Sequence, residues 1–386
     1  MNTGKFVFSQ LVEFLPQRVF DGIVSKYQGN KYVKHFTCWN HLLAMMFGQL
    51  TRRDSLRDLI VALEAHNRKS YHLGFGKNIT RSNLSKANEN RNYKIFEEYA
   101  YYMINIARRK RANNNFEIQG KVYAFDSTTI DLCLSVFWWA KFRKFKAGIK
   151  LHTLYDMSTQ IPAFIHITEA SVNDMNAMDV IPYEYGAYYV FDRGYIDYTR
   201  LYKICTHSAY FVVRAKRNLK FKFNKLNTVK ENTGVISDQV GNLTGFYISK
   251  DYPDEIRKVV YYDKDSDKSF IYLTNNMELT AEQIALLYKN RWQVELFFKW
   301  IKQHLKVKSF WGTSENAVRI QIYCAIISYC LVAIIEKDLK LNRSTYEVLQ
   351  VLSISLLDKT TIIELFDSSD FNDVKELYLD QLSLNF

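Results

Sequence analysis

The sequence has few residues that cross-link or interrupt a chain. Its 386 residues include 5 cysteines, 4 prolines and 14 glycines. The cysteines are scattered and form no C-x-x-C pair, which argues against a zinc finger and a disulfide framework and favours a reducing compartment. Since proline and glycine mark loops and linkers, their scarcity predicts domains that pack closely rather than domains on flexible tethers.

The sequence also lacks a secretion signal and a clear membrane span. Its N-terminal segment, MNTGKFVFSQLVEFLP, does not have the architecture of a signal peptide. The most apolar run, Ile320 to Ile335, is interrupted by Gln321 and Ser328 and is short for a span. We therefore expect a core helix there, and a cytoplasmic protein that has no membrane partner.

Acidic residues are scarce relative to basic ones. The chain has 52 lysines and arginines against 40 aspartates and glutamates, a net charge of +12. Basic residues crowd the first half of the chain, whereas the region after Leu357 is mainly acidic. This asymmetry predicts a phosphate-binding front and a protein-contacting tail. The alternative is a basic protein with no polyanionic partner.

The pattern of apolar residues divides the chain into five regions. Residues 1–118 read as helical, 119–217 as strands and helices, 218–278 as strands, 279–340 as helical and 341–386 as an acidic helical tail. In the second region the order is three strands, a helix, a strand, a helix and a strand. A ribonuclease-H-like core requires such a mixed sheet with helices on its faces. We predict an α/β fold: a ribonuclease-H-like catalytic core with a β-rich insertion, an N-terminal all-helical domain and a helical C-terminal tail.

Four runs of β-forming residues make up the predicted insertion. They are residues 221–225, 244–249, 257–263 and 269–276. Helix resumes at Thr280, which has the capping-box spacing with Gln283. We expect this helix to continue unbroken to about residue 305.

Four polar residues share one side of that predicted helix. At about 100° per residue, they fall within an arc of about 60°. They are Tyr288, Arg291, Glu295 and Lys302. The positions around them are almost all apolar, so the helix should be buried, where a carboxylate is costly unless something requires it. The arrangement suits a divalent metal on Glu295 with a phosphate beside it. A buried ion-pair cluster that stabilises a helix bundle is the alternative.

Two further carboxylates follow apolar strand-like runs. Asp126 and Asp192 each come after a phenylalanine, and we expect both to end a strand at the rim of the sheet, where ligands bind in α/β folds. A later helix can bring Glu295 over them. Three converging carboxylates provide the oxygen ligands that Mg²⁺ or Mn²⁺ prefers, and a metal pair supports in-line phosphoryl displacement. Taken alone, each aspartate is equally well explained as a residue that caps a turn.

Together these motifs resemble those of the bacterial DDE transposases grouped around insertion sequence four. The Tyr-x2-Arg-x3-Glu-x6-Lys spacing is similar to that family's signature. Asp126, Asp192 and Glu295 match its three catalytic acids. The resemblance implies that these acids hold two Mg²⁺ or Mn²⁺ ions per active site. It also implies that Tyr288, Arg291 and Lys302 grip a DNA phosphate.

The same resemblance implies cut-and-paste transposition in the bacterial cytoplasm, at the nucleoid. Water would free a 3′-hydroxyl at the element's end, that hydroxyl would form a hairpin on the opposite strand, and it would later join the target. The implied partners are the terminal inverted repeats, target DNA and a second copy of the chain in a synaptic homodimer. Two alternatives remain: a metal-dependent endonuclease without joining, and a non-catalytic repressor that binds the element.

The insertion departs from the family pattern in one respect. Better-known relatives stack a tryptophan of the insertion on a flipped base, but this sequence has none between Asp192 and Arg291. Phe270 or Tyr272 could provide the stacking face, or Trp292 from the helix. This departure bears on the hairpin step and not on the metal chemistry.

A short polar helix in the N-terminal region is the candidate for reading DNA. It follows a glycine-containing turn and could be capped by Thr80 or Ser82. Its polar and basic residues resemble those of the second helix of a helix-turn-helix. They are Arg81, Asn83, Lys86, Asn88 and Arg91. A solvated helix face is the alternative.

Overall fold

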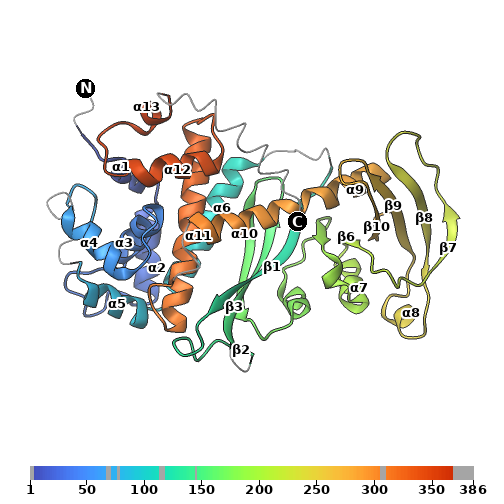
Figure 1. The fold of residues 1–386 in the computed structure, drawn as a ribbon, viewed down its shortest axis with the longest axis horizontal. Helices are drawn as coiled ribbons and strands as arrows, with labels where there is room; N and C mark the ends of the chain where they lie inside the picture. The colour runs from blue at the N-terminus through green and yellow to red at the C-terminus, as the bar shows by residue number, and fades with distance from the viewer. Residues whose placement is uncertain are drawn as a thin grey trace. The chain divides into compact units, whose positions relative to one another are not determined.

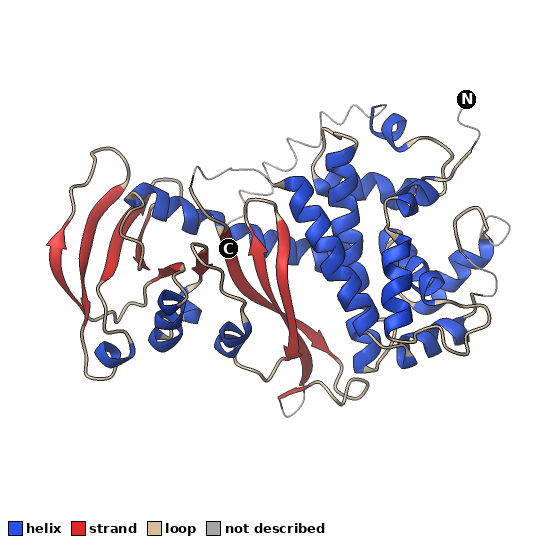
Figure 2. Ribbon diagram, turned by 180° about the vertical axis from the view of Figure 1, so that it is seen from behind, coloured by secondary structure: helices blue, strands red, loops and turns tan. Residues whose placement is uncertain are grey.

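The computed structural model describes residues 4–66, 71–75, 79–112, 118–143, 146–304 and 310–367. They form a mixed α/β fold with one large sheet and many helices, as the sequence predicted (Figure 1, Figure 2). The chain divides into two compact units. The helical unit contains Met1–Met103, His304–Gly312 and Asn316–Phe386, and the sheet unit contains Ile104–Gln303 and Thr313–Glu315.

The helical unit is built from segments at both ends of the chain. Its helices, two of which begin or end outside it, are α1 (Val7–Glu13), α2 (Gln17–Lys26), α3 (Cys38–Leu50), α4 (Leu56–Ala65), α5 (Arg81–Asn90), α6 (Lys94–Arg111), α11 (Glu315–Asp338), α12 (Thr345–Ser355) and α13 (Ile362–Asp367). The boundaries of the predicted domains stay predictions.

Helix α11 is the core helix expected from the apolar run. It is long and apolar enough to span a membrane, but 94% of its most apolar window is buried inside the protein. Its polar Gln321 is satisfied, because the backbone carbonyl accepts a hydrogen bond from the Gln49 side chain (2.7 Å) and the side-chain oxygen accepts one from the backbone N–H of Trp311 (2.8 Å). The two polar interruptions in the run therefore do not prevent burial, and the core-helix prediction is confirmed.

The sheet unit contains a single ten-stranded sheet. Its strands are β1 (Val122–Leu132), β2 (Lys141–Arg143), β3 (Lys146–Asp156), β4 (Ile161–Glu169), β5 (Tyr188–Phe191), β6 (Tyr210–Arg214), β7 (Phe221–Leu226), β8 (Val235–Leu243), β9 (Ile256–Asp263) and β10 (Lys268–Thr274). The order is β2-β3-β1-β5-β6-β10-β9-β8-β7, with β4 paired to β3. Strands β1, β5 and β6 are parallel, and the other pairings are antiparallel.

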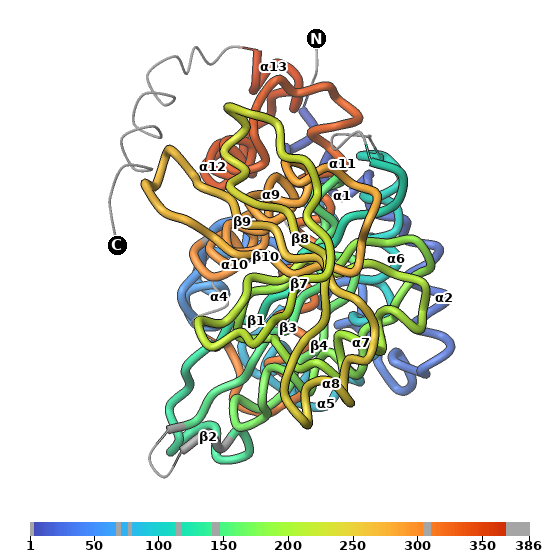
Figure 3. The backbone as a smooth tube through the Cα atoms, turned by 90° about the vertical axis from the view of Figure 1, so that its right-hand side faces the viewer, coloured from blue at the N-terminus to red at the C-terminus, as the bar shows by residue number. Residues whose placement is uncertain are grey.

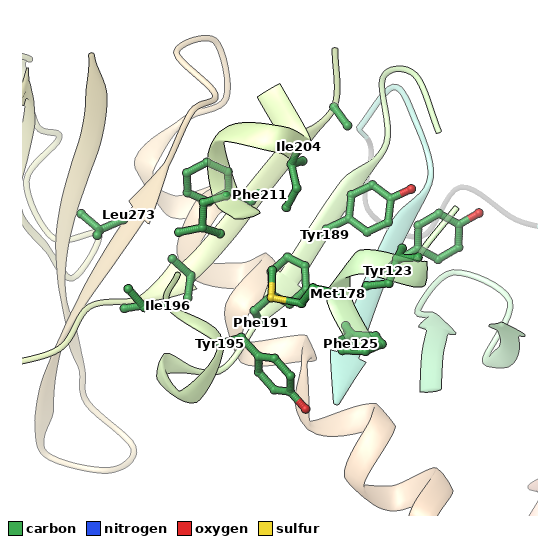
Figure 4. Packing of buried hydrophobic residues seen from close by; sticks show 14 of the residues in the cluster. Tyr123, Phe125, Met178, Tyr189, Phe191, Tyr195, Ile196, Ile204, Phe211 and Leu273 are labelled. Carbon is green, nitrogen blue, oxygen red and sulfur yellow. The ribbon is translucent and has the colours of Figure 1, made fainter. Parts of the chain in front are cut away.

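One face of the three parallel strands carries the aromatic core of this unit. Side chains from β1, β5 and β6 gather there with α7 (Tyr198–Thr206) and the short helix η2 (Asp174–Val180) (Figure 4). Phe125 and Phe191 are fully buried in it. Because successive side chains of a strand point to opposite faces, Asp126 points away from this core. Burial of these aromatic side chains therefore positions β1, the strand that carries the candidate acid Asp126.

Strand β1 does not end at Asp126, so that prediction is wrong. Its antiparallel pairing with β3 continues to Leu132, opposite Ala147. Only the parallel pairing with β5 ends there, at the Phe125–Phe191 pair. Asp126 therefore lies where β1 and β5 stop pairing. Asp192 follows the last residue of β5, as expected.

The insertion strands join the core sheet, because β10 pairs with β6. The predicted strand at residues 244–249 is wrong: that segment is a loop entering α8 (Ile248–Asp251), and the strand is β8. Strand β8 contains Asp238 and Gly241, which are poor β-formers. Asp238 is tolerated because Arg257 binds it at 2.7 and 2.9 Å. A Cβ at Gly241 would lie 2.1 Å from the Lys222 carbonyl oxygen, so the close approach of β7 requires glycine.

Candidate active site

The sheet brings the two candidate aspartates to the same level on neighbouring strands. Phe125 and Phe191 are directly paired in the parallel register, and Asp126 and Asp192 are the next residues. The turn-cap alternative does not explain them. Asp126 lies within a strand, and the Asp192 side chain caps no backbone N–H at the start of the short helix that follows it.

The predicted single helix is divided at Arg291. Helix α9 (Ala281–Asn290) begins with the expected Thr280–Gln283 capping box and ends at Arg291, and α10 (Trp292–His304) follows at once. Arg291 has helical dihedrals (φ −53°, ψ −31°), so the interruption is small. Tyr288 therefore lies on α9, Glu295 and Lys302 lie on α10, and Arg291 lies at the junction between the two helices.

Arg291 joins two of the candidate acids. One terminal nitrogen donates to Asp126 Oδ2 (2.9 Å) and the other to Glu295 Oε1 (2.6 Å). Its side chain is only 13% exposed. Asp126 on β1 and Glu295 on α10, far apart in the sequence, consequently lie on either side of one guanidinium group.

Tyr288 holds the third acid. Its hydroxyl donates to Asp192 Oδ1 (3.1 Å), and its ring lies 4.7 Å from the ring of Tyr272 on β10. Burial, helped by the Asp192 charge, raises the pKa of Tyr288 to about 12. The phenol therefore stays protonated at neutral pH and can donate to an oxygen.

The electrostatics of the cluster favour a cation. Burial raises the pKa of Asp126, and the charges of Glu295 and Asp192 raise it further, while Arg291 opposes the shift. Three carboxylates face one guanidinium, so negative charge is in excess when all are ionised. These oxygens are the donors that Mg²⁺ or Mn²⁺ takes, and the residues present therefore fit such ions.

The carboxylates are not gathered into a ready metal-binding group. Among the described residues, no three acidic, histidine or cysteine side chains are close enough together to hold an ion. The Arg291 guanidinium lies between Asp126 and Glu295 and keeps them apart. Metal binding by all three acids therefore requires Arg291 to leave this position.

Lys302 contacts the same strand at another point. Its ammonium donates to the backbone carbonyl of Thr129 (2.8 Å), further along β1 from Asp126. Like Tyr288 and Arg291, it lies within the sheet unit, but it does not touch any of the three acids. The structure thus gathers Tyr288, Arg291 and the acids in one cluster and leaves Lys302 beside it.

An aromatic cavity adjoins the cluster. It has a volume of about 510 Å³ and lies between α9 and the strands β9 and β10. Its aromatic walls are Tyr261, Phe270, Tyr272, Tyr288 and Trp292, and Arg291 lines it too. Trp292, which is 53% exposed, contradicts the expected burial of the apolar residues in this segment.

Residues that sequence reasoning passed over surround Asp126. The Ser127 N–H donates to Asp126 Oδ1 (2.8 Å), and the Ser127 hydroxyl donates to Asp174 Oδ1 (2.7 Å). The Lys150 ammonium lies 3.1 Å from the same Asp174 oxygen. Asp174 lies in the first turn of η2, and only the fold brings it to Ser127. No local pattern identifies such a partner.

The candidate DNA-reading helix is α5, capped by Thr80 as predicted. Arg81, Asn83 and Lys86 are exposed on it. Asn88 is buried and bonded to His41 (2.7 Å). Residues 66–80 separate α4 from α5, and this segment is longer than the turn of three or four residues in a helix-turn-helix.

Arg91, at the end of α5, is used inside the helical unit. Its guanidinium donates to the carbonyl of Thr37 (2.8 Å) and to that of Phe36, and it lies 5.0 Å from the centre of the Phe36 ring. These contacts tie α5 to the segment before α3. They give Arg91 a structural explanation that does not need DNA.

Comparison with known proteins gives consistent results. A family model described as "Transposase DDE domain" matches residues 118–331, and a model of a domain of unknown function matches residues 3–76. A Sinorhizobium fredii protein named as a transposase is 36% identical over 272 residues, which are 69% of this chain and 74% of the relative.

Two further relatives carry names of the same kind. A Geobacillus stearothermophilus protein named for insertion sequence element IS5377 is 28% identical over 65% of this chain and 66% of the relative. A Synechocystis protein named for element IS4SA is 24% identical over 75% of this chain and 81% of the relative. Both names describe transposases.

Proposed function

The chain belongs to the transposase DDE domain family, whose members are enzymes that act on DNA, and we propose that it moves an insertion sequence by cut-and-paste transposition. The observation that carries the proposal is the Arg291 bridge between Asp126 and Glu295, with Asp192 at the matching level of the neighbouring strand. The mixed sheet, parallel at β1, β5 and β6, supports a ribonuclease-H-like core.

The family implies dependence on a divalent metal. Asp126, Asp192 and Glu295 would hold Mg²⁺ or Mn²⁺, two ions per site. When bound, such ions activate the attacking oxygen and stabilise the leaving oxygen of an in-line displacement. The three carboxylates are the chain's own contribution: they would hold the ions near the carboxyl end of β5, where β1 and β5 stop pairing.

Arg291 would change partners during the reaction. With the carboxylates bound to metal ions, its guanidinium would be released from them and could bind a DNA phosphate through paired donors. Its Nε is buried and has no hydrogen-bond partner among the described residues, so one donor is already uncommitted. Tyr288 would donate a hydrogen bond from its phenol hydroxyl to a phosphate oxygen, and Lys302 would add a charge beside it.

The proposed sequence of steps begins with water, which attacks the phosphodiester at the element's end and frees a 3′-hydroxyl. That hydroxyl would attack the opposite strand to make a hairpin, and after reopening it would attack target DNA. The aromatic cavity supports the hairpin step, because the partly exposed Phe270 and the exposed Trp292 line it and could stack on an extruded base where the family's tryptophan is missing, whereas Tyr272 is buried.

The proposed partners are the terminal inverted repeats and target DNA. Transposases bind DNA, and we propose a homodimer that pairs two element ends, in the cytoplasm at the nucleoid. The predicted N-terminal domain, residues 1–118, would read the repeats through Arg81, Asn83 and Lys86 on α5, which are exposed.

The proposal is tested with purified protein, Mg²⁺ and a labelled inverted-repeat end. Product joined to target DNA supports transposition. Cleavage without joining would favour a metal-dependent endonuclease, and a gel shift without cleavage would favour a repressor. Both outcomes would reject the proposed function.

A further inference from the structure

A segment of the insertion carries charge of one sign. Residues 216–230, which contain β7, include six basic and no acidic residues, and all six basic residues are exposed. They are Lys216, Arg217, Lys220, Lys222, Lys225 and Lys230. The whole chain has 52 basic and 40 acidic residues, so this segment is far richer in positive charge than the chain as a whole. We call it the β7 basic strip.

Strand β7 is the last strand of the sheet. It pairs with β8 on one side, and no other described strand pairs with it (Figure 1, Figure 3). Lysines on an edge strand protect against pairing with another chain. That role accounts for Lys222 and Lys225 on the strand but not for the four basic residues outside it. A polyanionic partner accounts for all six.

The register directs two of these lysines to the face of the sheet that carries the candidate active site. Lys222 and Lys225 pair with Asn242 and Val240 on β8, and Val240 pairs with Arg257 on β9. Directly paired residues share a face. A bulge between Phe223 and Lys225 keeps both lysines on the same face, where an unbroken strand would alternate them.

Helix α9 identifies that face. Arg257 donates to the Leu279 carbonyl (2.6 Å) just before α9 begins, and Tyr288 at the other end of α9 donates to Asp192 (3.1 Å). Lys222 and Lys225 therefore lie on the side of the sheet where α9 reaches the catalytic acids.

The distance along the sheet suits a bound duplex. Five strand spacings separate β5 from β7, which at about 4.8 Å each amount to about 24 Å. Duplex DNA rises about 3.4 Å per base pair, so this span corresponds to about 7 base pairs. Helix α9 packs on this face against β5, β6, β8 and β9, so a duplex that runs from the catalytic acids over α9 would reach the β7 basic strip.

We propose that the β7 basic strip is a second DNA-binding surface, which contacts the phosphate backbone about 7 base pairs from the cut. The proposal rests on the proposed function, because the active site supplies the first point of contact. Lys222 and Lys225 would neutralise phosphates without reading bases.

The test compares two variants of equal charge. Lys222→Ser/Lys225→Ser removes two charges from the strip. Lys264→Ser/Lys268→Ser is the control: Lys264 lies in the β9–β10 turn and Lys268 begins β10, and both are exposed among Asp263, Asp265 and Asp267. Affinity for a duplex that extends about 14 base pairs on each side of the cut is measured against salt. The strip variant should lower the slope of log K against log salt by about 2, whereas the control should match wild type.

Shortened duplexes show which side of the cut is bound. One substrate is shortened to about 4 base pairs on the element side, and another is shortened to the same length on the flanking side. Wild type should bind one of these two substrates more weakly than the full duplex, whereas the strip variant should bind that substrate as it binds the full duplex. A strip variant with the wild-type slope on the full duplex would overturn the inference. If the wild type cleaves the duplex in that experiment, the proposed function is retained. If it does not, the proposed function is rejected instead.

Discussion

At the scale of single residues, the account depends on the guanidinium of Arg291. It bridges Asp126 and Glu295 at 2.9 and 2.6 Å and lies where cations bound by both carboxylates would be. A positive group in this position stabilises three acids that would otherwise repel one another. Arg291 thus has two proposed states, one bound to carboxylates and one bound to a DNA phosphate.

Glu295→Gln should keep DNA binding and lose cleavage by at least about a hundredfold, or about 2.7 kcal/mol of transition-state stabilisation. The amide keeps an oxygen for Arg291 but loses the charge that holds a metal. Gel shifts and a cleavage time course measure the two effects. Glu282→Gln, in the first turn of α9, is the matched control. Cutting at the wild-type rate would reject Glu295 as a catalytic acid.

Arg291→Ala should weaken binding to cut ends more than to uncut ends. A cut end carries a terminal phosphate or hydroxyl near the metals, and only there does the proposed phosphate contact form. Gel shifts with both substrates measure the ratio of affinities. Equal loss on the two substrates would count against a role in holding the cut end.

His152 should make stability depend on pH. Burial lowers the pKa of His152 to about 4, below its ordinary value of about 6.5 in the unfolded chain. The unfolded chain then binds more protons, so stability should fall as the pH falls from about 6.5 to about 4. Urea unfolding of wild type and His152→Gln between these limits measures the effect. The variant should show the smaller slope, and identical slopes would contradict the assignment.

At the scale of elements, β7 and β8 approach unusually closely, at Gly241. Gly241→Ala should destabilise the sheet unit by about 1–3 kcal/mol, because its Cβ would meet the Lys222 carbonyl. Gly22→Ala on α2, where nothing lies within 4 Å, should instead stabilise its helix by about 0.5–1 kcal/mol. Thermal unfolding measures both. A neutral Gly241→Ala would show that the strands can separate freely.

The elements also show what sequence could predict. The Phe-Asp pairs at Asp126 and Asp192 were recognisable because each follows an apolar run that forms a strand. The capping box of α9 was recognisable because it is a local sequence pattern. The continuation of β1 beyond Asp126 was not predictable, because it depends on pairing with β3. The helix break at Arg291 was not predictable either, because Arg291 has helical dihedrals and the apolar spacing continues on both sides. Such features are decided by tertiary contacts.

The candidate site was predictable only in part for the same reason. The spacing of Tyr288, Arg291 and Glu295 indicated a charged cluster, but not that Arg291 would bridge two acids. Strand β8 was missed because the Asp238–Arg257 pair that stabilises it joins two strands. Single-sequence patterns do not contain such pairings.

At the scale of the whole molecule, one sheet contains the strands that carry the candidate acids and the insertion. Strand β10 pairs with β6, so the insertion continues the core sheet. This continuity gives the aromatic cavity and the β7 basic strip fixed positions relative to the acids within the sheet unit. It explains how a substrate could contact residues from Asp126 on β1 to Lys225 on β7.

We propose that Asp126, Asp192 and Glu295 together hold divalent cations. Anomalous scattering from a crystal of the protein with a cut element end, soaked in Mn²⁺, locates those ions. Manganese peaks coordinated by all three carboxylates are expected, with Arg291 turned to a DNA phosphate. Manganese bound elsewhere, with Arg291 still bridging Asp126 and Glu295, would contradict the proposal.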